Sequence, residues 1–223
     1  MVGKESSTIA TISISPRYLR AKRFLDIAFT LLTSVLIIPI GLLLALLIWC
    51  DSRGPVIFRQ KRVGMNGIEF DMLKFRSMYA NSDDSLHRLA IVKYMSGQAL
   101  NDTKDTPYKL DNDDRVTRIG RFIRRTSLDE LPQFWNVLRG EMTLVGPRPP
   151  LPYEVELYSS RDRLRLAGKP GLTGPWQIYG RNRVPFQEMV EIDIAYLQRQ
   201  SLYEDIKLIA LTALVMVRGD GGI

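Results

Sequence analysis

The feature that most constrains this chain is a run of twenty-four residues, Ile27 to Cys50, without a charged side chain. As a helix this run extends about 36 Å, which exceeds the roughly 30 Å hydrocarbon core of a bilayer. It is apolar on every face, unlike a helix that packs one side on a soluble core. The run therefore predicts insertion into a membrane.

The flanks and the middle of this run indicate how it enters the membrane. Basic residues precede it (Arg17, Arg20, Lys22 and Arg23) and follow it (Arg53, Arg59, Lys61 and Arg62). The positive-inside rule places both flanks on the cytoplasmic side. Pro39 removes a backbone donor and kinks the helix, and Ile38 before it carries no hydroxyl to satisfy the freed carbonyl. A re-entrant hairpin is favoured, and a straight spanning helix is the alternative.

The composition of the chain limits the classes of partner that it can bind and the kinds of site that it can form. The net charge of +7 points to anionic partners such as lipid headgroups, phosphorylated ligands or nucleic acid. The single cysteine, Cys50, excludes a disulfide within these residues, and the single histidine, His87, excludes a His-rich metal site. No A-x-A-like site follows the apolar run, so a cleavable leader is not expected.

The rest of the chain predicts a cytoplasmic domain. Residues 1–16 are expected to be a flexible tail, residues 17–50 the basic flank and anchor, and residues 51–223 a catalytic domain with interfacial helices. Two strands joined by a turn at 65–67 predict a hairpin, and residues 141–149 predict a short strand that leads into a rigid loop. Further helices are predicted at 85–95, 150–168, 188–200 and 208–217. The fold expected is α+β, predominantly helical with a small sheet.

An arginine-rich segment precedes an adjacent acidic pair, Asp129-Glu130. At 100° per residue, the apolar and basic side chains of residues 116–125 separate onto two helix faces. The apolar face holds Val116, Ile119, Phe122 and Ile123, and the basic face holds Arg118, Arg121 and Arg125. Ser127 interrupts this helix, and the acidic pair opens a second one that stops at Gly140.

Two interpretations of the acidic pair are open. Ser127 and Glu130 have the spacing of a capping box, in which their side chains would only cap the start of a helix. Alternatively, Asp129 is a nucleophile beside a second carboxylate, facing an anionic substrate that the arginines hold. The two interpretations are compatible, because a cap can fix the turn while Asp129 faces outward.

Three motifs resemble those of a known family. They are Arg124-x-x-Ser127-Leu128-Asp129-Glu130-Leu131, Asn136-Val137-Leu138-x-Gly140 and Val145-Gly146-Pro147-Arg148-Pro149. The family is that of the bacterial sugar transferases that make polyprenyl-diphosphate sugars, the monotopic phosphoglycosyl transferases. The similarity extends from about Arg20 to about Arg218.

This resemblance implies a re-entrant helix–break–helix anchor and a specific reaction. A sugar 1-phosphate passes from a UDP-sugar to undecaprenyl or another polyprenyl phosphate, and UMP is released through a covalent aspartyl-phosphosugar intermediate. Asp129 is the expected nucleophile and Glu130 its metal-linked or proton-handling partner. The pair is expected to hold Mg²⁺, which prefers hard oxygen ligands. Such a reaction initiates the assembly of an exopolysaccharide or another glycoconjugate.

The same resemblance selects the candidate substrate-binding residues. They are Lys74, Arg76, Arg124, Arg148, Gln177, Arg181 and Asp193. Without it, Lys74 and Arg76 are equally a solvated strand end, and Arg148 an exposed residue of a rigid turn. Asp193 has a structural salt bridge to an arginine as its alternative.

The expected location is the cytoplasmic face of the bacterial inner membrane. The expected partners are a UDP-sugar, a polyprenyl phosphate and anionic membrane lipid, with a homodimer as a further candidate and no nucleic acid. Two rivals remain, a non-enzymatic membrane-anchored module that binds polyanions and a phosphohydrolase that uses water as acceptor. The module leaves an acidic pair inside a basic patch unexplained.

Overall fold

The computed structural model describes residues 12, 14–79, 85–97, 113, 115–180 and 184–217. Arg181 and the predicted tail at 1–16, apart from a few residues, lie outside the described part. In chain order the elements, with η for short 3₁₀ or π turns, are α1 (Pro16–Asp51), β1 (Ile57–Val63), η1 (Met65–Gly67), β2 (Glu69–Phe75), α2 (Ser85–Met95), α3 (Arg118–Arg125), η2 (Leu128–Glu130), α4 (Gln133–Arg139), β3 (Thr143–Val145), α5 (Pro152–Glu156), η3 (Asp162–Ala167), β4 (Gly171–Thr173), η4 (Trp176–Gly180), α6 (Phe186–Arg199) and α7 (Leu202–Val217).

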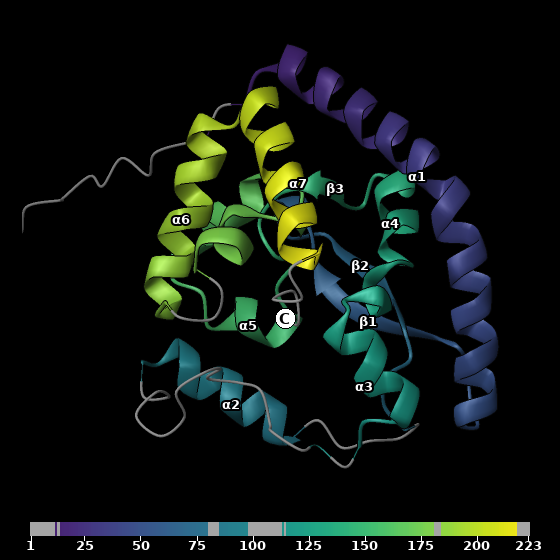
Figure 1. The fold of residues 1–223 in the computed structure, drawn as a ribbon. Coiled ribbons are helices and arrows are strands. Elements are labelled where there is room, and N and C mark those ends of the chain that lie inside the picture. The colour runs from purple at the N-terminus through teal and green to yellow at the C-terminus, as the bar shows by residue number, and fades with distance from the viewer. Residues whose placement is uncertain are drawn as a thin grey trace, which may run out of the picture.

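Helix α1 contains the whole apolar run and is bent. In Figure 1 it crosses the top of the molecule and then turns down its right-hand side. Pro39 lies inside the helix, and the hydroxyls of Thr33 and Ser34 donate to carbonyls three or four residues earlier, at 2.8 and 2.7 Å. Both features bend helices. We call residues 16–38 the first arm of α1 and residues 39–51 its second arm.

Length and composition make α1 a candidate to cross a membrane. Only 11% of its most apolar window is buried within the structure. A core helix of a soluble protein would be mostly covered, so the exposure of α1 agrees with the predicted membrane anchor.

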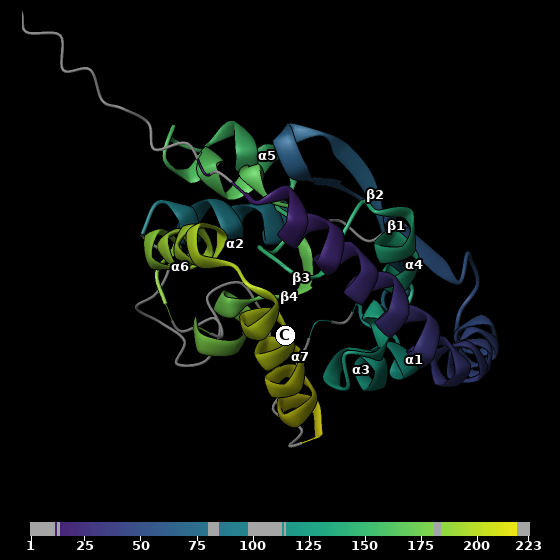
Figure 2. The same cartoon turned by 90° about the horizontal axis from the view of Figure 1, so that it is seen from above.

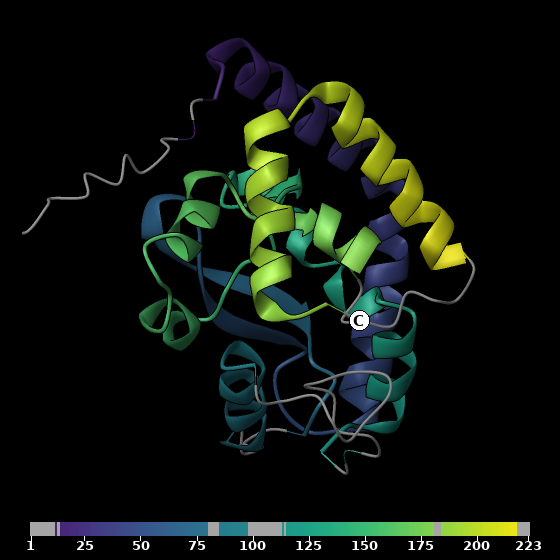
Figure 3. The same cartoon turned by 90° about the vertical axis from the view of Figure 1, so that its left-hand side faces the viewer.

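Buried polar side chains fasten the first arm to the rest of the molecule. The Lys22 ammonium donates to Asp205 at the start of α7, at 2.8 Å, and to the Tyr196 hydroxyl of α6, at 3.0 Å. Asp26 accepts from the Thr143 hydroxyl of β3 at 2.8 Å and from the following backbone amide at 2.9 Å. Viewed from the left-hand side, the first arm lies across the top of the molecule, beside the start of α7 (Figure 3).

The predicted hairpin is confirmed. Strands β1 and β2 pair antiparallel, and the turn between them contains Asn66 (φ 58°) and Gly67 (φ 81°), both left-handed. Phe70 and Met72 of β2 are buried in the core, and Lys74 follows them at the strand's end. Helices α3 and α4 pack against α1 (Figure 2).

One of the two strands of a second small sheet was predicted from the sequence. Strand β3 was expected, but its parallel partner β4 lies where the sequence indicated only a glycine-rich loop. Gly171 explains the pairing, because a Cβ there would sit 2.1 Å from the amide nitrogen of Gly146. The absence of a side chain lets the two backbones approach.

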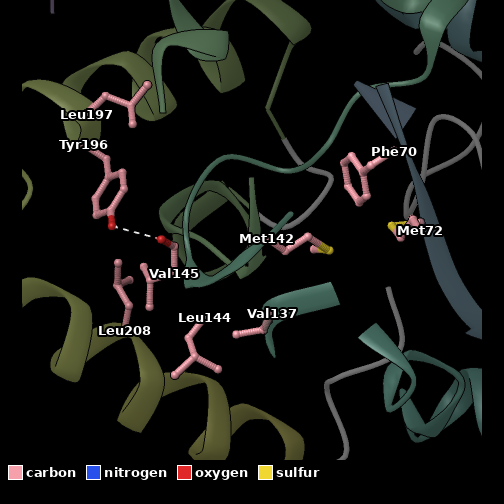
Figure 4. Close-up of a cluster of buried hydrophobic side chains, with 9 residues drawn as sticks. All are labelled: Phe70, Met72, Val137, Met142, Leu144, Val145, Tyr196, Leu197 and Leu208. Atoms are coloured by element: carbon pink, nitrogen blue, oxygen red, sulfur yellow. Dashed lines mark hydrogen bonds between the residues drawn. The ribbon is translucent and has the colours of Figure 1, made fainter. Parts of the chain in front are cut away.

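The main hydrophobic core lies where β2, α4, β3, α6 and α7 meet (Figure 4). It contains Phe70, Met72, Val137, Met142, Leu144, Val145, Tyr196, Leu197 and Leu208. The Tyr196 hydroxyl donates to the Val145 carbonyl at 3.2 Å. Leu208 shows that α7 packs one face on the core, whereas Tyr203 and Ile206 are exposed.

The helix predicted at 150–168 is wrong. The segment forms the short helix α5 and the 3₁₀ turn η3, separated by an irregular stretch. Of its charged side chains, Glu154, Asp162 and Arg165 are buried, whereas Glu156, Arg161 and Arg163 are exposed. Partners distant in sequence, chiefly Asp193 on α6, hold Arg165 inside.

Candidate active site

The acidic pair sits in the turn η2, between α3 and α4. The hydroxyl of Thr117 caps α3 by accepting from the amide of Gly120 at 2.9 Å. Ser127, before η2, is left-handed (φ 56°), and its side chain makes no capping hydrogen bond. A capping box requires an extended N-cap residue, so the predicted capping box is wrong. Gly140 ends α4 as predicted, with φ 80°.

Lys74 of β2 reaches this turn from the hairpin. Its ammonium lies 2.7 Å from Oε1 of Glu130 and 3.8 Å from Oδ2 of Asp129. Asp129 is only 9% exposed. The structure thus brings together three residues from two distant sequence motifs, and the cation bridges both carboxylates.

The neighbours of Asp129 shift the pKa of its carboxyl in opposite directions. Burial raises the pKa of the Asp129 carboxyl, and the neighbouring Glu130 charge adds to this, while Lys74 and Arg124 oppose it. The net direction is upward. A carboxylate with a raised pKa is more basic and, when ionised, a stronger nucleophile.

The arginines of α3 are not equivalent. Arg124 is partly buried and acts electrostatically on Asp129, whereas Arg121 and Arg125 are exposed. The predicted apolar face of this helix is correct for Ile123, which is fully buried, and wrong for Phe122, which is 53% exposed. Because α3 begins only at residue 118, it is too short to bury a wide stripe.

Two further arginines come from β1 and from the loop after β3. Arg148 lies in the loop after β3, with its guanidinium 6.0 Å from the centre of the Trp176 ring. Arg62 of β1 is buried and donates to the Pro149 carbonyl at 2.8 Å. Burial and the charge of Arg148 lower the pKa of Arg62 to about 10, whereas Glu130 is among the anions that raise it.

Sequence reasoning missed Arg62. In β1 Lys61 is exposed, whereas Arg62 and the following Val63 are both buried, so a simple alternation did not single out Arg62. Lys74 and Arg124 act on Asp129, and Arg62 interacts electrostatically with Glu130, so cations from β2, α3 and β1 make a cationic surround for the two carboxylates. Such a surround suits a diphosphate, whose charge arginine and lysine recognise directly.

Arg76 lies elsewhere. It is 6% exposed, and its guanidinium donates to the carbonyls of Pro55 and Ser52, each at 2.6 Å. Although it follows Lys74 by only two residues, its donors are directed to backbone carbonyls and away from the acidic pair.

Asp193 and Gln177 are also apart from the acidic pair. Asp193 is fully buried, and its Oδ2 accepts from two nitrogens of Arg165 at 2.6 and 3.0 Å. This arrangement supports the structural alternative for Asp193. Gln177 donates to the Leu172 carbonyl at 3.3 Å, and its Oε1 is buried without a partner among the described residues.

The donor set can be compared with the needs of Mg²⁺. Within the described part of the chain, no group of three or more Asp, Glu, His or Cys side chains could hold a metal. Magnesium bound together with substrate phosphates needs only one or two carboxylates, and Asp129 and Glu130 provide that number. The residues therefore fit a metal that arrives with a phosphorylated substrate.

Comparison with known proteins gives one family. Residues 17–219 match the model described as "Bacterial sugar transferase". Galactosyl transferase CpsE of Streptococcus agalactiae serotype III is 44% identical over 205 residues, which are 92% of this chain and 44% of that protein. Undecaprenyl-phosphate galactose phosphotransferase of Salmonella typhimurium is 41% identical over 205 residues, 91% of this chain and 42% of that protein. Exopolysaccharide production protein ExoY of Sinorhizobium fredii is 39% identical over 201 residues, 89% of this chain and 87% of that protein. The chain thus spans less than half the length of the first two relatives and most of the third.

Proposed function

The chain belongs to the bacterial sugar transferase family, and on that premise we propose that it transfers a sugar 1-phosphate from a UDP-sugar to undecaprenyl or another polyprenyl phosphate. UMP is the second product. The observation that carries the proposal is the buried Asp129 carboxylate set beside Glu130 and Lys74 inside a cationic surround. The names of relatives, among them an undecaprenyl-phosphate galactose phosphotransferase, support the same substrates.

Asp129 is the proposed nucleophile. One of its carboxylate oxygens attacks the sugar-bearing phosphorus, and the bond from that phosphorus to the bridging oxygen breaks. UMP leaves with the electron pair, and the sugar phosphate stays on Asp129 as an acyl phosphate. An oxygen of the polyprenyl phosphate then attacks the same phosphorus and releases the Asp129 carboxylate.

The neighbouring cations have distinct parts in this scheme. Lys74 neutralises Glu130 at 2.7 Å, so that two adjacent carboxylates are tolerated while Asp129 remains available. Arg124 and Arg148 are the proposed clamps for phosphate oxygens of the donor. Asp129 and Glu130 would hold Mg²⁺, which when bound neutralises the negative charge of the diphosphate.

The anchor gives the site access to a lipid acceptor. The bent course of α1, the proline inside it and the basic flanks on both sides of the apolar run support a re-entrant insertion from the cytoplasmic face of the bacterial inner membrane. Insertion of this kind holds the acidic pair against the leaflet in which the acceptor lies. Anionic lipid would meet the basic flanks, and a homodimer stays a prediction.

The test is UMP release by the purified protein with Mg²⁺, undecaprenyl phosphate, and UDP-galactose or UDP-glucose. We expect lipid-dependent UMP with one of these donors, and its loss in Asp129→Asn. Asp71→Asn is the matched control, because the Asp71 carboxylate lies in an exposed ion pair with Lys61 at 3.2 Å. UMP formed equally fast without lipid would identify a hydrolase, and full activity of Asp129→Asn would refute the proposed nucleophile.

A further inference from the structure

The end of α1 is capped from another element. No basic residue lies in the last turn of α1, so the helix itself provides no positive charge at its carboxyl end. Arg76 provides it, since its Nη2 donates to the Ser52 carbonyl at 2.6 Å, to the Ser52 hydroxyl at 2.9 Å and to the Ile48 carbonyl at 3.4 Å. A cation at this end satisfies unpaired carbonyls and complements the helix dipole.

A second tie joins the same helix end to α3. The carboxylate of Asp51, the last residue of α1, accepts from the amide of Ile119 at 3.2 Å. This amide belongs to the first turn of α3, where the backbone donors lack partners within the helix. The end of α1 is therefore bonded both to the segment that follows β2 and to the helix that leads into the acidic turn.

Apolar packing reinforces both ties. Leu44 and Ile48 of the second arm form a buried cluster with Phe75 of β2 and Ile123 of α3. Leu128 and Leu131, the residues that flank the acidic pair, pack against this cluster. Phe75 lies between Lys74 and Arg76 in the sequence. The residues next to Lys74 and next to Asp129 therefore both pack against the second arm of α1.

We infer that Arg76 is a positioning residue, which couples the second arm of α1 to the placement of Lys74 against Asp129 and Glu130. The inference rests on the proposed function and deepens it. The membrane-inserted arm then acts as a support for the site as well as an attachment. A displacement of about 1 Å at a reacting group costs on the order of 100-fold in rate, so a loosened arm has a measurable effect.

The first measurement needs no activity. Cys50 is the single cysteine of the chain and is exposed one residue before the end of α1, so a nitroxide label there reports on the helix end. In nanodiscs, we expect the label to become more mobile in Arg76→Lys, because lysine lacks the planar fork that reaches several carbonyls together. Arg59→Lys, the same change at an exposed position of β1, is the control and should leave the mobility unchanged.

The second measurement is kinetic and uses unlabelled protein. In Arg76→Lys we expect kcat to fall about 10- to 100-fold, with the KM for the UDP-sugar changed less than about 3-fold. Rates are expressed per folded protein, measured from the amplitude of the thermal unfolding transition, so that loss of folded protein does not account for the fall. Ser52→Ala removes a single acceptor and should give smaller changes in the same direction if Arg76→Lys does not fold.

The two hypotheses fail in different ways. Absence of UMP release by the unmodified protein overturns the proposed function, and the label mobility then decides the tie between Arg76 and α1. Equal label mobility in Arg76→Lys and Arg59→Lys overturns the inference. A loosened label with an unchanged kcat overturns it as well, since the arm would then move without effect on the site.

Discussion

Replacing Lys74 by methionine removes the charge shared by the two carboxylates while keeping a side chain of similar length. At the 3.8 Å that separates the Lys74 ammonium from the Asp129 carboxylate, two unit charges interact by about 1 kcal/mol in bulk water and about 4 kcal/mol at an effective dielectric of 20. The side chains of Lys74 and Asp129 are 24% and 13% exposed, so the true value lies between these limits.

This energy acts on the ionised form of Asp129, the form that attacks phosphorus in the proposed reaction. Loss of Lys74 raises the pKa of Asp129 further, in the direction in which burial already shifts it. The acidic limb of the pH–rate profile should therefore move to higher pH in Lys74→Met. At a pH below that limb, kcat/KM should fall by roughly 5- to 1000-fold, the range that 1 to 4 kcal/mol corresponds to.

The assay is UMP release across the acidic pH range, with Lys61→Met as the matched control. Lys61 belongs to the same hairpin and pairs with Asp71 at 3.2 Å, but its side chain is 63% exposed. Exposed ion pairs contribute little, so this variant should keep the wild-type profile. An unchanged acidic limb in Lys74→Met would show that the lysine does not control the nucleophile and would refute the electrostatic argument.

Three further predictions follow from the same geometry. Asp193→Asn should destabilise the fold by about 3–5 kcal/mol, because it leaves Arg165 buried without its ion pair. The protein that still folds should keep the wild-type KM for the UDP-sugar. A raised KM without a loss of thermal stability would instead support a substrate role for Asp193. Gly171→Ala should destabilise the fold by about 1–3 kcal/mol, because its Cβ would overlap the backbone of Gly146. A native melting temperature would contradict the close pairing of β3 and β4. Arg148→Met should raise the KM for the UDP-sugar about 10- to 100-fold, the worth of a charge-assisted hydrogen bond, with little change in kcat; an unaltered KM would mean that Arg148 only packs on Trp176.

Local pattern was enough for the elements whose determinants lie within a few residues. The hairpin turn at Asn66 and Gly67, helix α2 and the stop of α4 at Gly140 were all predicted, because each depends on turn chemistry or periodicity. The apolar run gave the long helix for the same reason.

What local pattern left open shares a physical cause, which is pairing across the sequence. Arg76 matches a motif beside Lys74, and its guanidinium donates to the carbonyls of Ser52 and Pro55, which follow α1 and lie more than twenty residues earlier in the chain. Arg165 reads as part of a solvated charge run until Asp193 of α6 is placed beside it. The strand β4 exists because glycines allow two backbones to approach, and no local propensity encodes that.

The sequence was sufficient to select several residues of the candidate site, but not to predict how they are arranged. The acidic pair and Lys74 were selected from motifs, and the structure places them in contact. Arg62 was missed because it lies in an apparently basic edge and is held inside by the distant Pro149 carbonyl, to which it donates. The left-handed backbone of Ser127 could not be read from a spacing that fits a capping box equally well.

The contact between Lys22 and Asp205 has a consequence for how the protein is made. The two residues are 183 positions apart, so the carboxylate to which Lys22 is hydrogen-bonded in the fold is absent until α7 has been synthesised. At 5 to 20 residues per second, this interval is roughly 10 to 40 s. The apolar run has left the ribosome long before then, and it can enter the bilayer while its polar base is still hydrated. Docking of α7 onto that base would be a late step of maturation, completed at the membrane surface with the anchor already in place.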